Sequence, residues 1–138
     1  MNFPTSLYTI EADIFDALAH PARLEILEVL RGGEACVCHI QAMSNQRQSY
    51  ISQQLNVLRQ AGVVTSRKEG QWTFYQVSEP RLYDVIDQIK EILQSLGKWQ
   101  PEFSTGPDMN SKRKECNCPQ CSLQTHDQPC IPSKVSQD

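Results

Sequence analysis

The sequence lacks any hydrophobic run close to the roughly 20 apolar residues that a membrane-spanning helix needs. It also lacks the charged start of a secretory signal peptide, because no Lys or Arg precedes the first apolar residues of MNFPTSLYTIEADIF. These two absences lead us to expect a cytoplasmic protein with no membrane partner.

The residue patterns of common enzyme sites are missing too. There is no Gly-rich phosphate-binding loop, no Ser-His-Asp set and no pair of catalytic carboxylates in a recognisable context. We therefore expect neither an enzyme nor a protein that uses an organic cofactor.

A strong overall charge is also absent. The 138 residues include 13 Lys and Arg against 16 Asp and Glu, and this net charge of −3 argues against a general binder of polyanions. The charge is unevenly distributed, since residues 45–81 hold five basic and two acidic residues while residues 1–44 and 82–111 are acidic. Only this central segment is suited to face phosphate groups.

The length of the chain leaves room for one core plus tails. Residues 99–138 are rich in Pro, Ser, Asn and Gln and poor in aliphatic side chains, which predicts a flexible tail. That tail nevertheless contains four of the six cysteines. Residues 1–98 are predicted to form the folded domain.

The spacing of apolar residues predicts a mainly α fold with one small β-hairpin. Helices are expected over residues 10–18, from Pro21 to Gly32-Gly33, from about Cys36 to residue 43, from Ile51 to about Gln60 and from Pro80 to about Leu96. Two β-rich runs, 63–67 and 72–77, predict a hairpin with the four-residue loop 68–71. This order of elements is typical of a winged helix-turn-helix.

The helix after the turn has a polar face that is nearly free of acidic side chains. Amide side chains pair with adenine edges in the major groove, and hydroxyl groups bind phosphates or single base edges. The candidate DNA contacts are Arg47, Gln48, Ser49, Tyr50, Ser52, Gln53 and Asn56 around this helix, with Arg67 and Lys68 on the wing. The alternative is an ordinary solvated helix face and an ordinary hairpin charge.

A single recognition helix buries too little surface for specific binding at physiological salt, so a symmetric dimer that reads two half-sites is expected. The apolar stripe from Leu82 to Leu96, together with Ile10 and Ile14, is longer than one small core needs. We predict that this stripe packs against the same stripe of a second copy in a homodimer. Packing on the first helices of the same chain is the alternative.

Cys36 and Cys38 lie at the predicted start of a helix, where the helix dipole favours thiolate, the form that binds soft metals. Positions i and i+2 of a helix point about 200° apart, so the two sulfurs converge only where the first turn is frayed or begins after Cys36. Two thiolates are too few, because As(III) takes three sulfurs and Cd(II), Pb(II) or Zn(II) takes three or four ligands. For either cysteine alone, a buried and unreactive thiol is the alternative.

The tail offers further sulfur ligands in a C-x-C-x-x-C cluster. These candidates are Cys116, Cys118 and Cys121. We predict a composite site that joins Cys36 and Cys38 to one or two of them, from either subunit, with two separate sites as the alternative. Cys130 is the weakest candidate, and His39 and His126 are expected to be bystanders.

Four strings, in this order and at these separations, resemble the ArsR/SmtB family of metal-responsive bacterial repressors. They are AHPARLEIL at 19–27, EACVCHI at 34–40, SYISQQLNVLRQAGVV at 49–64 and RKEGQWTFYQVS at 67–78. The resemblance covers about residues 10–96. It implies an α-rich homodimer that binds a palindromic operator and releases it when a ligand occupies a regulatory site.

The sequence departs from that family at three points. Residues 44–47 read Ser-Asn-Gln-Arg where members commonly have Leu-Gly-Leu-Ser, so the helix N-cap is not evident and Arg47 becomes a candidate for a phosphate contact. Gln41 stands where arsenite-binding members with C-x-C-x-x-C have their third thiol. The last helix has Asp84 and Asp87 but no histidine, which argues against the interfacial zinc site of the family's zinc sensors.

We therefore expect a repressor that leaves its operator when As(III), Sb(III), Cd(II) or Pb(II) binds the thiolates and shifts the helix before the turn. A repressor that responds to oxidants is the second interpretation, because Cys118 and Cys121 form a C-x-x-C pair. A third interpretation makes the tail a structural zinc site that recruits a partner protein.

Overall fold

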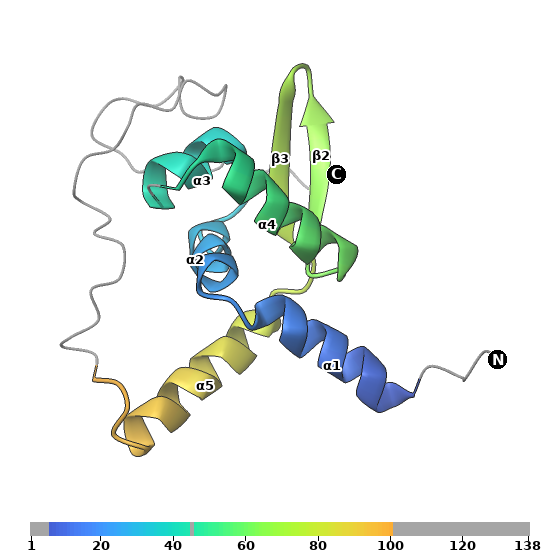
Figure 1. The fold of residues 1–138 in the computed structure, drawn as a ribbon. Coiled ribbons are helices and arrows are strands. Elements are labelled where there is room, and N and C mark those ends of the chain that lie inside the picture. The colour runs from blue at the N-terminus through green and yellow to red at the C-terminus, as the bar shows by residue number, and fades with distance from the viewer. Residues whose placement is uncertain (1–5, 45, 101–138) are drawn as a thin grey trace.

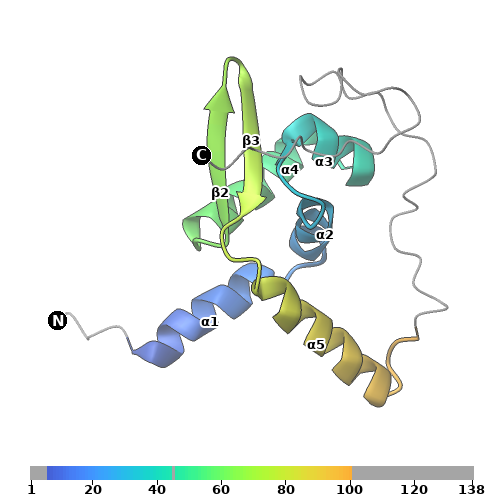
Figure 2. The ribbon, with the colours of Figure 1, turned by 180° about the vertical axis from the view of Figure 1, so that it is seen from behind.

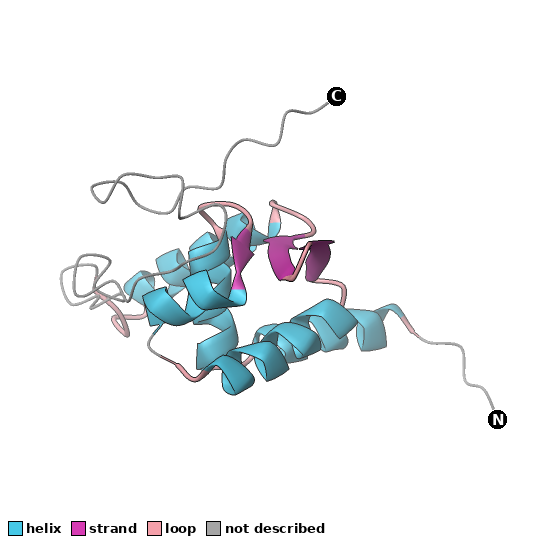
Figure 3. Cartoon of the chain, turned by 90° about the horizontal axis from the view of Figure 1, so that it is seen from above, coloured by secondary structure: helices cyan, strands magenta, loops and turns pink. Residues whose placement is uncertain are grey.

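The computed structural model describes residues 6–44 and 46–100, which form five helices and one three-stranded antiparallel sheet (Figures 1 and 2). The elements are α1 (Leu7–Leu18), α2 (Pro21–Leu30), β1 (Ala35–Cys36), α3 (Val37–Ser44), α4 (Gln48–Gln60), β2 (Val64–Glu69), β3 (Trp72–Val77) and α5 (Leu82–Ser95). The predicted mainly α fold is confirmed, and Figure 3 distinguishes the helices in cyan from the strands in magenta. No described helix combines the length and apolar composition that spanning a bilayer requires.

Local capping residues set the ends of α1 and α2. Ser6 caps α1 by accepting a hydrogen bond from the backbone N–H of Thr9. His20 caps α2 in the same way, since its Nδ1 accepts from the N–H of Ala22 at 3.1 Å. Pro21 occupies the first turn of α2, as the sequence predicts, because that position needs no N–H donor.

α3 and α4 form the helix-turn-helix, and Asn45, which the sequence predicts to lie in the turn, is outside the described residues. α4 begins at Gln48, earlier than the expected Ile51, and Arg47 occupies the N-cap without a side-chain hydrogen bond to the helix. Gly62 follows the end of α4 with a φ of 79°, the left-handed conformation that favours glycine after a helix. The predicted termination at Gly62 is therefore confirmed.

The sheet has the order β1-β3-β2, and its hairpin loop is shorter than predicted. Lys68 and Glu69, expected in the loop, instead extend β2 by pairing with Thr73 and Trp72. The connection is thus a two-residue loop that starts at Gly70, whose φ of 59° suits such a tight turn. The two-residue strand β1 was not expected, because two residues are too few to show an alternating pattern.

The two faces of the sheet pack against different clusters. One face meets the helices in the main core, whose fully buried members are Leu27, Ile40, Ile51, Leu55, Leu58 and Val64. Successive strand residues point to opposite faces, so Cys36 and Phe74 lie on the other side of the sheet. There they form a second cluster, the thiol cluster, against which Cys38 and Trp72 pack.

α5 divides its apolar stripe between two surfaces. Ile86 is buried, and Leu82 packs against the main core. The helices α1 and α5 lie at the end of the molecule away from the tip of the hairpin (Figure 1), and several of their other apolar side chains are exposed. This apolar surface of α1 and α5 consists of Leu7, Tyr8, Ile10, Phe15, Val85, Ile89, Ile92 and Leu96. Ile14, predicted to belong with it, packs against the main core instead.

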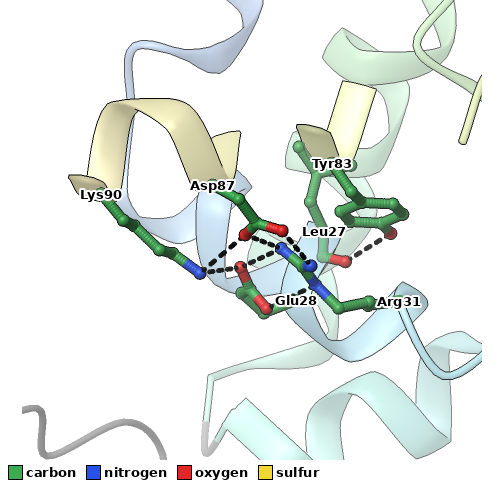
Figure 4. A network of polar contacts seen from close by, with 6 residues as sticks. All are labelled: Leu27, Glu28, Arg31, Tyr83, Asp87 and Lys90. Carbon is green, nitrogen blue, oxygen red and sulfur yellow. Dashed lines mark hydrogen bonds and ion pairs between the residues drawn. The ribbon is translucent and has the colours of Figure 1, made fainter. Parts of the chain in front are cut away.

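An ion-pair network fastens α5 to α2 (Figure 4). Arg31 donates two hydrogen bonds to the carboxylate of Asp87, at 3.0 and 2.9 Å, and it also pairs with Glu28. Lys90 donates to Glu28 at 2.8 Å and completes the network. The arrangement fixes the direction in which α5 leaves the domain.

Tyr83 strengthens the same joint. Its hydroxyl donates to the backbone carbonyl of Leu27 at 2.6 Å, and the guanidinium of Arg31 lies over its ring, 4.5 Å from the centroid. Burial raises the pKa of Tyr83, so the hydroxyl remains a proton donor at all physiological pH values.

The Asp87→Asn substitution is expected to lower the unfolding temperature at pH 7 by a few degrees, because it removes the charge that Arg31 binds. Hydrogen bonds from Arg31 lower the pKa of Asp87, and although burial raises the pKa of Glu28, bonds from Lys90 and Arg31 lower it overall. Such carboxylates stabilise the fold above their ordinary pKa values of 3.8 and 4.5 and lose that contribution as the pH falls through their folded values. In circular-dichroism melts, the difference between wild type and variant should therefore shrink as the pH falls from 7 to below these ordinary values.

Glu91→Gln is the matched control, since it removes an exposed carboxylate from the same helix outside the network. It should melt close to wild type at both ends of this pH range. Equal melting of Asp87→Asn and wild type at pH 7 would show that the network adds nothing to stability.

Candidate nucleic-acid interface and thiol pair

α4 exposes a continuous polar face to solvent, and the apolar residues on its opposite side pack into the main core. Ser49, Ser52, Gln53 and Asn56 are all exposed, and their spacing of three and four places them on one side of the helix. Gln48 is exposed at the first turn. The structure thus brings together five of the residues predicted to contact DNA.

Tyr50 lies at the edge of this face. It is half-buried and its ring centroid is 6.4 Å from that of His20 on the α2 side. The neighbouring Gln54 accepts a hydrogen bond from Arg23 at 2.9 Å, and Arg23 also donates to backbone carbonyls at the end of α1. One side of α4 is therefore anchored to the first two helices, which leaves the polar face directed away from the domain.

The two wing candidates have different surroundings. Lys68 is exposed on β2. Arg67 is bound by two carboxylates, because its Nε donates to Glu34 at 2.7 Å and its Nη1 to Glu69 at 2.9 Å. Glu34 lies far from Arg67 in the sequence, so no local pattern reveals this pair. A DNA contact by Arg67 stays a prediction.

The sulfurs of Cys36 and Cys38 are joined in a disulfide, with their Cα atoms 5.4 Å apart. β1 ends at Cys36 and α3 begins at Val37, so the condition for the sulfurs to converge, a helix that starts after Cys36, is met. Cys36 is only 2% exposed, and its Sγ accepts a hydrogen bond from the backbone N–H of His39 at 3.4 Å. A strand-to-helix junction thus directs both sulfurs to one point.

The chemistry of this pair suits a soft ion. In the reduced form, Cys36 and Cys38 supply two adjacent thiolates. Within residues 6–44 and 46–100, no cluster of three or more Cys, His, Asp or Glu is arranged to hold a metal. The cysteines Cys116, Cys118 and Cys121 lie outside this range.

The structure supports the sequence argument against an interfacial zinc site on α5. The carboxylate of Asp87 is already bound by Arg31, and α5 contains no histidine. Zinc sites generally need His or Cys among their ligands, and the described part of α5 offers neither.

An exposed polar helix after a turn, with an antiparallel hairpin beside it, defines a winged helix-turn-helix DNA-binding protein. Residues 20–66 match the family described as "Bacterial regulatory protein, arsR family". A helix-turn-helix transcriptional regulator of Methanocaldococcus jannaschii is 41% identical over 86 residues, which cover 62% of this chain and 97% of that protein. The chain belongs to the ArsR family of bacterial transcription regulators, and it is not an enzyme.

Two further comparisons extend this result. A Halobacterium salinarum protein, whose name describes an arsenical resistance operon repressor, is 30% identical over 93 residues, covering 64% of this chain and 78% of that protein. The solution structure of a homodimeric winged helix-turn-helix domain from Mycobacterium bovis superposes with a TM-score of 0.60 at 26% identity, covering 68% of this chain and 90% of that chain. The fold found here is therefore the one that ArsR-type regulators use.

Proposed function

We propose that this protein is a homodimeric transcriptional repressor that releases its operator when a thiophilic ion binds Cys36 and Cys38. The observation that carries the proposal is the convergence of the two sulfurs at the start of α3, the first helix of the helix-turn-helix. The candidate ions are As(III), Sb(III), Cd(II) and Pb(II), with Zn(II) as a further possibility, because thiolates bind such ions tightly. The protein acts in the cytoplasm, where it reaches the chromosome.

In the DNA complex, the polar face of α4 enters the major groove and the hairpin lies over the flanking backbone. The proposed contacts are Arg47, Gln48, Ser49, Tyr50, Ser52, Gln53 and Asn56 from the helix region and Arg67 and Lys68 from the wing. The exposure of the α4 face supports base contacts by Gln53 and Asn56. The position of Arg47 at the N-cap of α4 supports a phosphate contact by this residue.

Homodimerisation accounts for the apolar surface of α1 and α5. Eight large apolar side chains on two helices remain exposed in the single chain, which is more than scattered surface residues explain. A second copy of the same surface covers them in a two-fold symmetric pair. The homodimeric Mycobacterium bovis domain of the same fold supports this arrangement.

Three or four ligands are needed around the ion, and this chain's tail provides the remaining thiols. Cys36 and Cys38 contribute two, and we propose that Cys116, Cys118 or Cys121 completes the set. The name of the Halobacterium salinarum relative supports an arsenical as the ligand, and the short spacing of the tail cysteines supports a soft ion.

Coupling to DNA follows from the position of α3. Cys36 and Cys38 fix the first turn of this helix, and Ile40, fully buried, holds the next turn against the main core. A change at the sulfurs therefore tilts α3 relative to α4 and disturbs the spacing of the two recognition helices. Each tenfold loss of operator affinity needs only about 1.4 kcal/mol, so a small distortion is enough.

The test is operator release, measured by fluorescence anisotropy on the reduced full-length protein with arsenite, Cd(II) and Pb(II). Wild type should lose at least tenfold in operator affinity with one of these ions. The Cys36→Ser plus Cys38→Ser variant should bind the operator as tightly as wild type and ignore every ion. Substituting Cys116, Cys118 and Cys121 with Ser should weaken the response.

Cys130→Ser is the matched control for the tail, because it removes a thiol outside the C-x-C-x-x-C cluster and should leave the response unchanged. Release of the double Cys36 and Cys38 variant by the same ions would contradict the proposed site. An unchanged response in the triple tail variant would show that the tail is not a source of ligands.

The disulfide between Cys36 and Cys38 favours a second candidate function, a repressor that responds to oxidants. Peroxide would take two electrons and two protons from the thiols, which leaves one disulfide and water. Operator release by peroxide with no effect of any ion would favour this function over ion sensing.

A further inference from the structure

Glu34 is an acidic side chain in an unusual position for this domain. Its side chain is only 7% exposed, yet it lies beside the wing and receives two hydrogen bonds from Arg67. Nε of Arg67 donates to Oε2 at 2.7 Å, and Nη2 donates to Oε1 at 2.5 Å. A buried carboxylate is costly unless it is paired, so this two-point contact is what makes the position of Glu34 tolerable.

Arg67 is held on its other sides as well. Nη1 donates to Glu69, and the guanidinium lies over the ring of Phe74, 4.8 Å from its centroid. Hydrogen bonds to Glu34 and then to Glu69 raise the pKa of Arg67, so the guanidinium stays charged. Its side chain is nevertheless 43% exposed, which leaves it within reach of a phosphate.

The pairing of the strands links this ion pair to the sulfurs. Phe74 on β3 is directly opposite Cys36 on β1 and directly opposite Arg67 on β2. Directly paired residues share a face of the sheet, so the sulfur of Cys36, the ring of Phe74 and the guanidinium of Arg67 lie side by side across the three strands. Glu34 precedes Cys36 by two residues, with only Ala35 between them.

Charge gives this arrangement a consequence for DNA binding. While Arg67 lies between Glu34 and Glu69, two carboxylates offset its single charge and weaken its attraction for phosphate. Nε and Nη2 of Arg67 are engaged with Glu34 and Nη1 with Glu69, so a two-point contact with a DNA phosphate has to displace one of these carboxylates.

We infer that Glu34 and an operator phosphate compete for Arg67, and that binding at Cys36 and Cys38 shifts this competition toward Glu34. β1 has only two residues, so a backbone change at residues 36–38 reaches Glu34 across a single residue. Glu34 is thus a positioning residue that carries the state of the thiols to the wing. The second half of the inference rests on the proposed ion sensing, whereas the first half does not.

The test measures operator affinity and its salt dependence for the reduced full-length dimer with and without arsenite, with Cd(II) as a second probe. Glu34→Gln should raise operator affinity by about tenfold with arsenite bound and by less without it. The slope of log affinity against log salt should steepen by about one, as for one added phosphate contact. The response to arsenite should shrink accordingly.

Glu69→Gln is the matched control, because Glu69 also pairs with Arg67 but is exposed on the wing itself and distant in sequence from the thiols. It should change affinity equally with and without arsenite and leave the response intact. In an Arg67→Gln background, Glu34→Gln should have no effect. Arg67→Lys, which keeps the charge but loses the two-point contact, should act in the same direction as Glu34→Gln and replaces it if that variant does not fold.

The outcomes separate the two proposals. If neither ion affects wild type, the proposed ion sensing is wrong. The competition between Glu34 and phosphate for Arg67 is then still tested by whether Glu34→Gln raises operator affinity and steepens its salt dependence. An unchanged salt slope in both Glu34→Gln and Arg67→Lys would overturn the inference. An effect of Glu34→Gln that persists in the Arg67→Gln background would overturn it as well.

Discussion

Ile89→Glu is expected to dissociate the homodimer and to weaken operator binding by about two orders of magnitude or more. Ile89 is 43% exposed in the single chain and lies on the apolar surface of α1 and α5. Two-fold symmetry places the new carboxylate in both copies, so the interface would bury two like charges without partners. Each monomer then holds one recognition helix and loses the second half-site.

Sedimentation velocity and anisotropy with operator DNA give the two readouts. Gln94→Glu is the matched control, because it adds the same charge to α5 at an exposed position almost opposite Ile89 around the helix. That variant should remain dimeric and bind the operator normally. A dimeric Ile89→Glu protein with normal operator affinity would rule out this surface as the dimer interface.

Leu55→Ala is expected to lower the free energy of unfolding by about 2–5 kcal/mol. Leu55 has no exposed surface and lies on the core side of α4, so its truncation removes buried apolar contacts and leaves a cavity. For a domain of ordinary stability this is a large share of the total, so the midpoint of unfolding should fall to a markedly lower urea concentration.

Urea unfolding at fixed protein concentration measures this change. Val57→Ala is the control on the same helix, because Val57 is 38% exposed and should cost less than about 1 kcal/mol. Equal losses for the two variants would show that the core side of α4 is assigned wrongly.

The features that could be predicted from the sequence are those with local signals. The helices follow from apolar spacing and from end signals such as Pro21 and Gly62, and the wing follows from two β-rich runs around a glycine. The strand β1 could not be predicted, because a two-residue strand depends on its pairing with Tyr75 and Phe74, far away in the sequence.

The candidate site divides in the same way. The polar face of α4 is a matter of helical spacing, so Ser49, Ser52 and Gln53 could be placed on it in advance. For the cysteines, the sequence indicates only the condition under which their sulfurs meet. The partnership of Glu34 with Arg67 depends on tertiary packing, and no local pattern contains that information.

The double use of α5 has a thermodynamic consequence. The helix packs into its own domain through Leu82 and Ile86 and exposes Ile89 and Ile92 further along its length, so the same element serves both folding and association. Mass action then makes the folded population depend on how many copies are present, since pairing withdraws folded chains from the unfolding equilibrium. At low copy number fewer chains are paired, so the regulator is least stable against unfolding. Operator DNA that binds both copies of a dimer then acts as a stabilising ligand.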